Sequence, residues 1–284
     1  MTNTSDENAL FTNGRERIRS DAPVFEIDQS WYGSNDPIPG IWITQRLIGG
    51  DGENHGRTYV MVYPWEGMTD PDGSIALSYG ADYYREGMSY TDAEDRHARV
   101  ECFQAAEILY LHAATKGNVD AYVDLGYIYS YDRCEGHYFV DHRQTENVED
   151  YTRPYPREQR AFECFFYAAE HGDAEACYKL GDLCKRGVGC EADPEKAFAW
   201  YTRAFELKDG MPPHVWGSIA LRLADAHENG IGCAFDPEKA LEWYKKAEAG
   251  LDIGVRSGAH FYTKTLANTR AAIKRLTQEL DGRY

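Results

Sequence analysis

The side chains best suited to chemistry lie together near the middle of the chain. Cys134, His137, Asp141 and His142 fall within nine residues, and each is a type that binds zinc. The Cys-x2-His-x4-His spacing of Cys134, His137 and His142 supplies no clear fourth ligand. The same stretch carries aromatic residues that suit packing onto helices. We therefore expect a structural loop and no bound metal.

A glycine pattern from Gly187 to Ala192 formally matches the dinucleotide-binding fingerprint. That fingerprint holds a pyrophosphate where a strand leads into a helix, whereas here it lies between two predicted helices. The GxxxxGK[ST], HExxH and GxSxG motifs do not occur. Lys196 and Lys239 lie next to acidic turns, so we expect them to neutralise charge on their helices. We predict a protein without enzymatic activity, catalytic residues or cofactors.

A repeat positions the residues of the C-terminal half. The segment from Leu180 to Ala204 recurs from Leu223 to Ala247, with equivalent residues 43 positions apart. Internal repeats of this length are typical of solenoid proteins. The repeat therefore determines the expected architecture, and it says little about the ligand.

Each copy of the repeat has the signals of two helices joined by a turn. Asp193 followed by Pro194 suits the start of a helix, since the carboxylate caps it and proline lacks the N–H that would be unpaired there. Gly187 suits the end of the preceding helix, because glycine adopts the left-handed conformation readily. Inside that first helix, Gly181 is replaced in the second copy by Ala224. This position therefore requires a small side chain that lets another helix approach closely.

Composition and charge limit the class of partner. The 284 residues include 47 Asp and Glu against 30 Lys and Arg, a net charge of −17, which disfavours nucleic acid and anionic membranes. No apolar run is long enough to span a bilayer, and no signal peptide is visible. The odd count of seven cysteines indicates reduced thiols. We expect a cytoplasmic protein.

The chain divides into three predicted parts. Residues 1–35 are polar and form a flexible arm. Residues 36–72 contain two β-branched and aromatic runs around Gly49–Gly52, which predicts a β-hairpin that caps the solenoid. Residues 73–284 form helix pairs from about Ser74 onward, interrupted by an insertion in the second repeat, and end in a capping helix at His260–Leu280.

The repeat resembles a known family. The residues that carry the resemblance are Ala176, Leu180, Gly181, Gly187, Val188, Gly189, Asp193, Lys196, Ala197, Trp200, Tyr201 and Ala204. This pattern is similar to the Sel1-like repeat, a relative of the tetratricopeptide repeat. The resemblance implies an all-α, right-handed α-α solenoid of helix pairs. Repeats of that family have about 36 residues, so we expect about seven extra residues within 205–216.

The resemblance also implies a binding surface and a scaffold or adaptor function. In related repeats, the first helix of each pair lines a concave face, and positions around the small residue reach the ligand. Here those positions are Tyr84, Arg85, Asp120, Val123, Tyr127, Ser130, Glu175, Tyr178, Asp182, Lys185, Leu221, Asp225 and Glu228. Their aromatic and acidic character suits a basic, partly apolar peptide or protein. We expect Asp182 and Asp225 to point into one groove and to be unburied.

Two other hypotheses remain open at this stage. The protein binds a small ligand, or acts as an enzyme, through the 132–157 insertion loop or a pocket under the N-terminal hairpin. Alternatively, it is a structural subunit that joins a homo-oligomer through its N-terminal arm. Long loops often have functions of their own, which keeps the insertion of interest.

Overall fold

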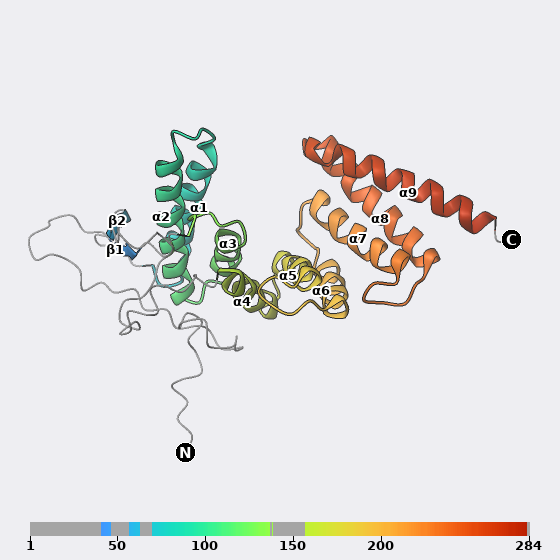
Figure 1. Cartoon of the computed structure of the whole chain (residues 1–284), viewed down its shortest axis with the longest axis horizontal. Coiled ribbons are helices and arrows are strands. Elements are labelled where there is room, and N and C mark those ends of the chain that lie inside the picture. The colour runs from blue at the N-terminus through green and yellow to red at the C-terminus, as the bar shows by residue number, and fades with distance from the viewer. Residues whose placement is uncertain (1–40, 47–56, 63–69, 137, 139–156, 283–284) are drawn as a thin grey trace, which may run out of the picture. The chain divides into compact units, whose positions relative to one another are not determined.

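The computed structural model describes residues 41–46, 57–62, 70–136, 138 and 157–282 (Figure 1). Within them, two strands precede four helix pairs, a short 3-10 helix and a last helix. The elements are β1 (Ile41–Arg46), β2 (Arg57–Val62), α1 (Ser74–Ser89), α2 (Arg96–Thr115), α3 (Val119–Ser130), α4 (Arg157–Glu170), α5 (Ala174–Arg186), α6 (Pro194–Glu206), α7 (Pro213–Asn229), α8 (Pro237–Arg256), η4 (His260–Tyr262) and α9 (Thr263–Asp281). The predicted all-α repeat architecture is confirmed. No helix in the described ranges is long and apolar enough to cross a membrane.

The chain divides into two compact units, Met1–Ala168 and Ala169–Tyr284, with the boundary inside α4. The two units differ in charge. Residues 1–168 contain 29 Asp and Glu against 14 Lys and Arg, whereas residues 169–284 contain 18 against 16. The acidity of the chain is therefore a property of the first unit.

The first unit contains both strands and the first two helix pairs. The strands pair antiparallel, with Ile41 opposite Val62, which confirms the strands of the predicted hairpin. β2 contacts α2, and the role of the hairpin as a cap stays a prediction. The core of the unit is aromatic, with the rings of Phe103, Tyr110 and Phe165 almost fully buried. The predicted N-terminal arm lies outside the described residues, as does most of the insertion.

The helix ends in the second unit confirm the signals of the repeat. The carboxylate of Asp193 accepts the backbone N–H of Lys196 at 2.9 Å, and the equivalent Asp236 accepts that of Lys239 at 3.0 Å. Gly187 ends α5 with a φ of 69°, which is the left-handed conformation expected there. The ammonium groups of both lysines pair with the same capping carboxylates, so their predicted neutralising role is also confirmed.

The small position within each first helix accommodates an aromatic ring from the second helix. A Cβ atom at Gly80 would lie 2.6 Å from the ring of Tyr110, and one at Gly126 would lie 2.6 Å from the ring of Phe165. At Gly181 it would overlap the ring of Tyr201. Each ring therefore packs directly on helix backbone, which is the close approach that the sequence indicated.

The extra residues of the last repeat lengthen its helices. α5 has 13 residues and α7 has 17, because α7 begins at Pro213, within the segment where the insertion was expected. The longer α7 crosses α8 closely, since a Cβ atom at Gly217 would lie 2.8 Å from the Leu251 nitrogen. α9 then covers α8 (Figure 1), and its Leu276 joins the buried cluster around Tyr244. The last helix thus closes the core of the second unit.

Candidate functional site

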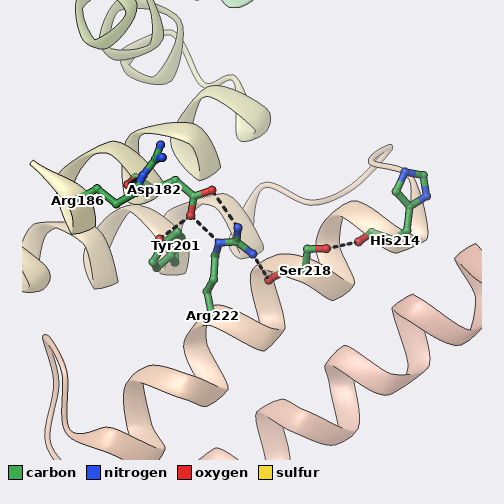
Figure 2. A network of polar contacts seen from close by, with 6 residues as sticks. All are labelled: Asp182, Arg186, Tyr201, His214, Ser218 and Arg222. Atoms are coloured by element: carbon green, nitrogen blue, oxygen red, sulfur yellow. Dashed lines mark hydrogen bonds and ion pairs between the residues drawn. The ribbon is translucent and has the colours of Figure 1, made fainter. Parts of the chain in front are cut away.

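The predicted groove of the second unit is organised around the carboxylate of Asp182. Arg222 of α7 donates to it from Nε at 2.6 Å and from Nη2 at 2.9 Å. The hydroxyl of Tyr201, from α6, donates to the same carboxylate at 2.8 Å. Figure 2 shows the guanidinium lying between Asp182 and the backbone oxygen of Ser218. One side chain of α5 therefore links α6 and α7.

This ion pair is largely removed from water. The side chains of Asp182 and Arg222 are 23% and 27% exposed. Burial by itself would lower the pKa of the Arg222 guanidinium, but its hydrogen bonds to Asp182, together with the electrostatic effect of the neighbouring Tyr178, raise the pKa overall. The guanidinium also lies over the ring of Tyr178, 4.6 Å from its centroid. Arg222 therefore stays protonated, and the charge of Asp182 is compensated within the protein.

The next repeat has a related arrangement. The hydroxyl of Tyr244 lies 2.6 Å from the carboxylates of both Asp225 and Glu228. Glu228 also forms an ion pair with Arg275 of α9. Burial and these two carboxylates raise the pKa of the Tyr244 hydroxyl, so it remains a donor at neutral pH. Asp225 and Glu228 of α7 are thus bound to α8 and α9.

A pocket of about 330 Å³ opens beside these acids, between α5, α6 and α7. Its apolar wall includes Ala197, Phe198 and Ile231, and the side chain of Ile231 is 46% exposed. Lys185 and Asp225 bring opposite charges to the lining. Arg222, which is paired with Asp182, also lines the pocket, so the accessible apolar surface is combined with two cationic groups and one carboxylate.

The structure corrects one expectation about the predicted groove. Asp182 and Asp225 were expected to be unburied, and this is wrong, because both are half-buried and accept hydrogen bonds from tyrosines. The lining of the pocket includes Lys185 and Asp225 but not Asp182. Glu175 is half-buried in the first turn of α5, and Leu221 packs against the core cluster instead of projecting freely. Binding at these residues stays a prediction.

The other predicted residues lie in the first unit. The ring of Tyr127 stacks on that of Tyr131, with centroids 5.9 Å apart. Val123 is only 9% exposed, so it offers little surface to a partner. Of the remaining four, the Tyr84 hydroxyl accepts a hydrogen bond from Arg133, and Arg85 pairs with Asp82 on the exposed face of α1. Asp120 is exposed in the first turn of α3, and the Ser130 hydroxyl is buried.

Several important side chains were absent from the predicted set. Arg222, Phe198 and Ile231 complete the site, and Tyr201 and Tyr244 hold its acids. A signal for the tyrosines was present in the sequence, since each follows its aspartate by 19 positions in both copies. No comparable signal marked Arg222, whose counterpart one repeat earlier is a lysine.

Of the possible metal ligands in the insertion, Cys134 is the one that lies within the described residues. The thiol of Cys134 is fully buried and lies 3.7 Å from a carboxylate oxygen of Glu107. Burial raises its pKa well above the usual range, which disfavours the thiolate that zinc requires. His137, Asp141 and His142 lie outside the described residues. No group of three or more metal-binding side chains occurs in the part of the chain that the structure describes.

These features define an α-helical repeat protein in which each small residue of a first helix receives a ring from the second. The model of the Sel1 repeat family matches residues 156–173, 174–209 and 220–249. The chain therefore contains Sel1 repeats at these positions, as the sequence pattern predicted. Proteins of this kind are generally non-enzymatic scaffolds that mediate protein–protein interactions.

Three solved structures resemble parts of the chain. A Sel1 repeat protein from Oxalobacter formigenes is 22% identical with a TM-score of 0.37, covering 50% of this chain and 88% of its own. A protective antigen of uropathogenic Escherichia coli with an SLR fold is 18% identical with a TM-score of 0.31, over 70% and 45% of the two chains. Cysteine rich protein B of Helicobacter pylori is 21% identical with a TM-score of 0.30, over 48% and 86%.

Proposed function

We propose that the second unit binds a partly apolar, basic segment of a partner protein in the pocket between α5, α6 and α7. The observation that carries this proposal is the composition of the pocket. Ile231 and Phe198 offer apolar surface, Lys185 and Asp225 flank it with opposite charges, and the charge of Arg222 in the same lining is compensated by Asp182. Its volume of about 330 Å³ suits one large side chain and the backbone beside it.

The apolar contact supplies most of the affinity in this proposal. Fully burying one leucine, isoleucine or phenylalanine side chain contributes about 1.5–3 kcal/mol. Ile231 is already held in a turn, because its backbone N–H donates to the Ala226 oxygen at 3.0 Å. The wall of the pocket is therefore ordered before a partner arrives, which lowers the entropic cost of binding.

The charged groups at the pocket determine which partner segments are preferred. Asp225 accepts from Tyr244 and has no cationic partner among the described residues, so it favours a lysine or arginine next to the apolar anchor of the partner. Asp182 contributes less, since Arg222 compensates its charge. The second unit is nearly balanced in charge, so the basic preference comes from Asp225 locally. Exposed charges mainly affect steering and specificity, and salt screens them.

A peptide-display library, selected on the full chain, tests this function. The enriched peptides should share an apolar residue next to a basic one and should bind less tightly as ionic strength rises. Ile231→Ser should abolish their binding. Phe235→Ser is the matched control, because Phe235 lies in the same turn, is 61% exposed and does not line the pocket.

Two results would count against the proposal. Peptides that bind the Ile231→Ser variant and the wild type equally well would place the interaction elsewhere. Equal loss of binding in both serine variants would show that the turn as a whole matters and that the pocket does not. Circular dichroism of each variant checks that the helices are intact.

A further inference from the structure

A second pocket belongs to the first unit and shares no lining residue with the proposed protein-binding site. It has a volume of about 300 Å³ and lies between the end of α1, the start of α2 and the turn 131–136. Met88 and Tyr131 bring exposed apolar surface to it, at 48% and 54% exposure, and Phe103 forms its buried floor. Its lining includes two cations, Arg99 and Arg133.

Aromatic rings surround the guanidinium of Arg133. Its central carbon lies 5.0 Å from the ring centroid of Tyr131, 5.4 Å from that of Phe103 and 5.6 Å from that of Tyr84. Its Nε donates a hydrogen bond to the Tyr84 hydroxyl at 3.1 Å. The rings hold the plane of the guanidinium, and the hydrogen bond occupies one edge. The two terminal nitrogens form no hydrogen bond or ion pair with any described residue.

The carboxylates nearest to Arg133 in the chain are already engaged by other groups. Glu135 forms ion pairs with Arg99 at 2.9 Å and with Arg96. Asp132 accepts the hydroxyl proton of Tyr138 and the backbone N–H of Gly136. Within the described residues, Arg133 therefore has no carboxylate partner, although both neighbouring acids line the same pocket.

The backbone of the turn holds this arrangement in place. Asp132 and Glu135 have φ angles of 48° and 50°, in the left-handed region that residues other than glycine seldom occupy. Such conformations persist where surrounding contacts enforce them, and they are frequent at binding sites. Here the contacts of Asp132 and Glu135 enforce the turn, and the turn directs Arg133 to the rings.

We infer that this pocket binds a carboxylate that is attached to an apolar or aromatic group. The terminal nitrogens of Arg133 present the paired donors that a carboxylate accepts in a bidentate manner. Met88, Tyr131 and the edge of Phe103 receive the attached group, and the volume suits a single ring. The carboxylate belongs either to the C-terminus of a peptide or to a small organic acid.

The net charge of the first unit opposes this ligand only at long range. The unit contains 29 acidic against 14 basic residues, but at physiological salt charges beyond about 8 Å are largely screened. Arg133 acts at contact distance, in a partly desolvated setting where a charge-assisted hydrogen bond is strong. Its affinity for a carboxylate should therefore change little, or even rise, as ionic strength increases from a low value.

Calorimetric titration of the full chain tests the inference with three probes. These are acetyl-Ala-Ala-Phe with a free carboxylate, the same peptide as its C-terminal amide, and 3-phenylpropanoate. The free peptide should bind at least about tenfold more tightly than the amide, as expected for a charged hydrogen-bond pair. Binding of 3-phenylpropanoate as well would assign the site to small acids in general, and binding of the peptide alone would assign it to C-termini.

Variants localise the effect. Arg133→Gln keeps a hydrogen-bond donor for Tyr84 and removes the charge, so it should weaken the binding of the free peptide at least about tenfold. Lys116→Gln is the matched control, since Lys116 has the same charge in the same unit, is exposed and does not line the pocket. Three results would each overturn the inference. They are equal binding of the free peptide and its amide, no binding of the free peptide and none of 3-phenylpropanoate, and an equal loss of binding in both variants.

Discussion

The hydroxyl of Tyr201 donates a hydrogen bond to the carboxylate of Asp182 across the two helices of one repeat. The same contact joins Tyr244 to Asp225 in the following repeat. Each ring packs against the small residue of the first helix, and its hydroxyl reaches the acid that comes next in the sequence. A position that was predicted to face the groove therefore connects helices, which changes what its substitution should do.

Asp182→Asn should destabilise the second unit. It leaves Arg222 half-buried without its compensating charge, and lost hydrogen bonds to a charged group cost about 1.5–3 kcal/mol. Urea unfolding, with hydrogen exchange of α5–α7 as a second readout, measures the loss. Asp209→Asn is the control, because that side chain is 99% exposed. If the two variants unfold alike, the ion pair has no structural role.

Gly181→Ala should also be destabilising, for a steric reason. The added methyl group overlaps the ring of Tyr201, and such overpacking costs about 1–3 kcal/mol. Ala224→Gly, at the equivalent position of the next repeat, should cost about 1–2 kcal/mol, from the usual penalty for glycine in a helix and the lost burial of one methyl group. A double-mutant cycle with Tyr201→Leu tests the mechanism. The Gly181→Ala penalty should shrink when the ring is absent.

The sequence alone predicted the features that depend on local signals. Gly187 and Pro194 mark helix ends because capping is decided within one helical turn. The small position at Gly181 was recognised because the repeat displays it twice. The architecture follows from these signals, since each helix pair must bury its apolar face against its own partner and the next pair.

The sequence could not predict the contacts that depend on how helices cross. Arg222 meets Asp182 from 40 residues away, and no periodicity shows which cation will reach which acid. The family resemblance implied that Asp182 faces the groove, but it could not show that the carboxylate is already paired. The turn at Asp132 was equally hidden, because its positive φ occurs without a glycine at that position.

Glu163 should make the stability of the first unit depend on pH. Burial raises the pKa of its carboxyl to about 7, although Arg160 and a hydrogen bond from Gln159 oppose the shift. A group whose pKa is higher in the folded state favours folding at low pH, and this contribution is lost as pH rises from about 4.5 to about 7. The contribution is roughly 3 kcal/mol at most.

The comparison of Glu163→Gln with the wild type between pH 5 and pH 8 measures this effect. Glutamine does not titrate, so the free energy of unfolding of the variant should fall less over this range than that of the wild type. Glu158→Gln, at an exposed position of the same helix, should keep the pH dependence of the wild type. Parallel curves for Glu163→Gln and the wild type would mean that Glu163 is ionised throughout.

Two kinds of contact attach α9 to the rest of the second unit, buried apolar packing and exposed ion pairs, and their contributions to stability can be compared. Leu276 is 2% exposed and packs against Ala224, Ala240 and Tyr244, so Leu276→Ala should cost about 2–4 kcal/mol from lost burial and the cavity that remains. Arg270 makes two ion pairs at 2.8 Å to α8, but its side chain is 50% exposed.

Because exposed ion pairs contribute little and salt screens them, Arg270→Ala should leave the stability close to that of the wild type. Hydrogen exchange of α9 and α8 measures both variants. Leu276→Ala should accelerate exchange throughout α9, because the helix loses its main contact with the core. If Arg270→Ala released α9 as strongly as Leu276→Ala does, and high salt released it in the wild type, then ion pairs and not apolar packing would hold the last helix in place.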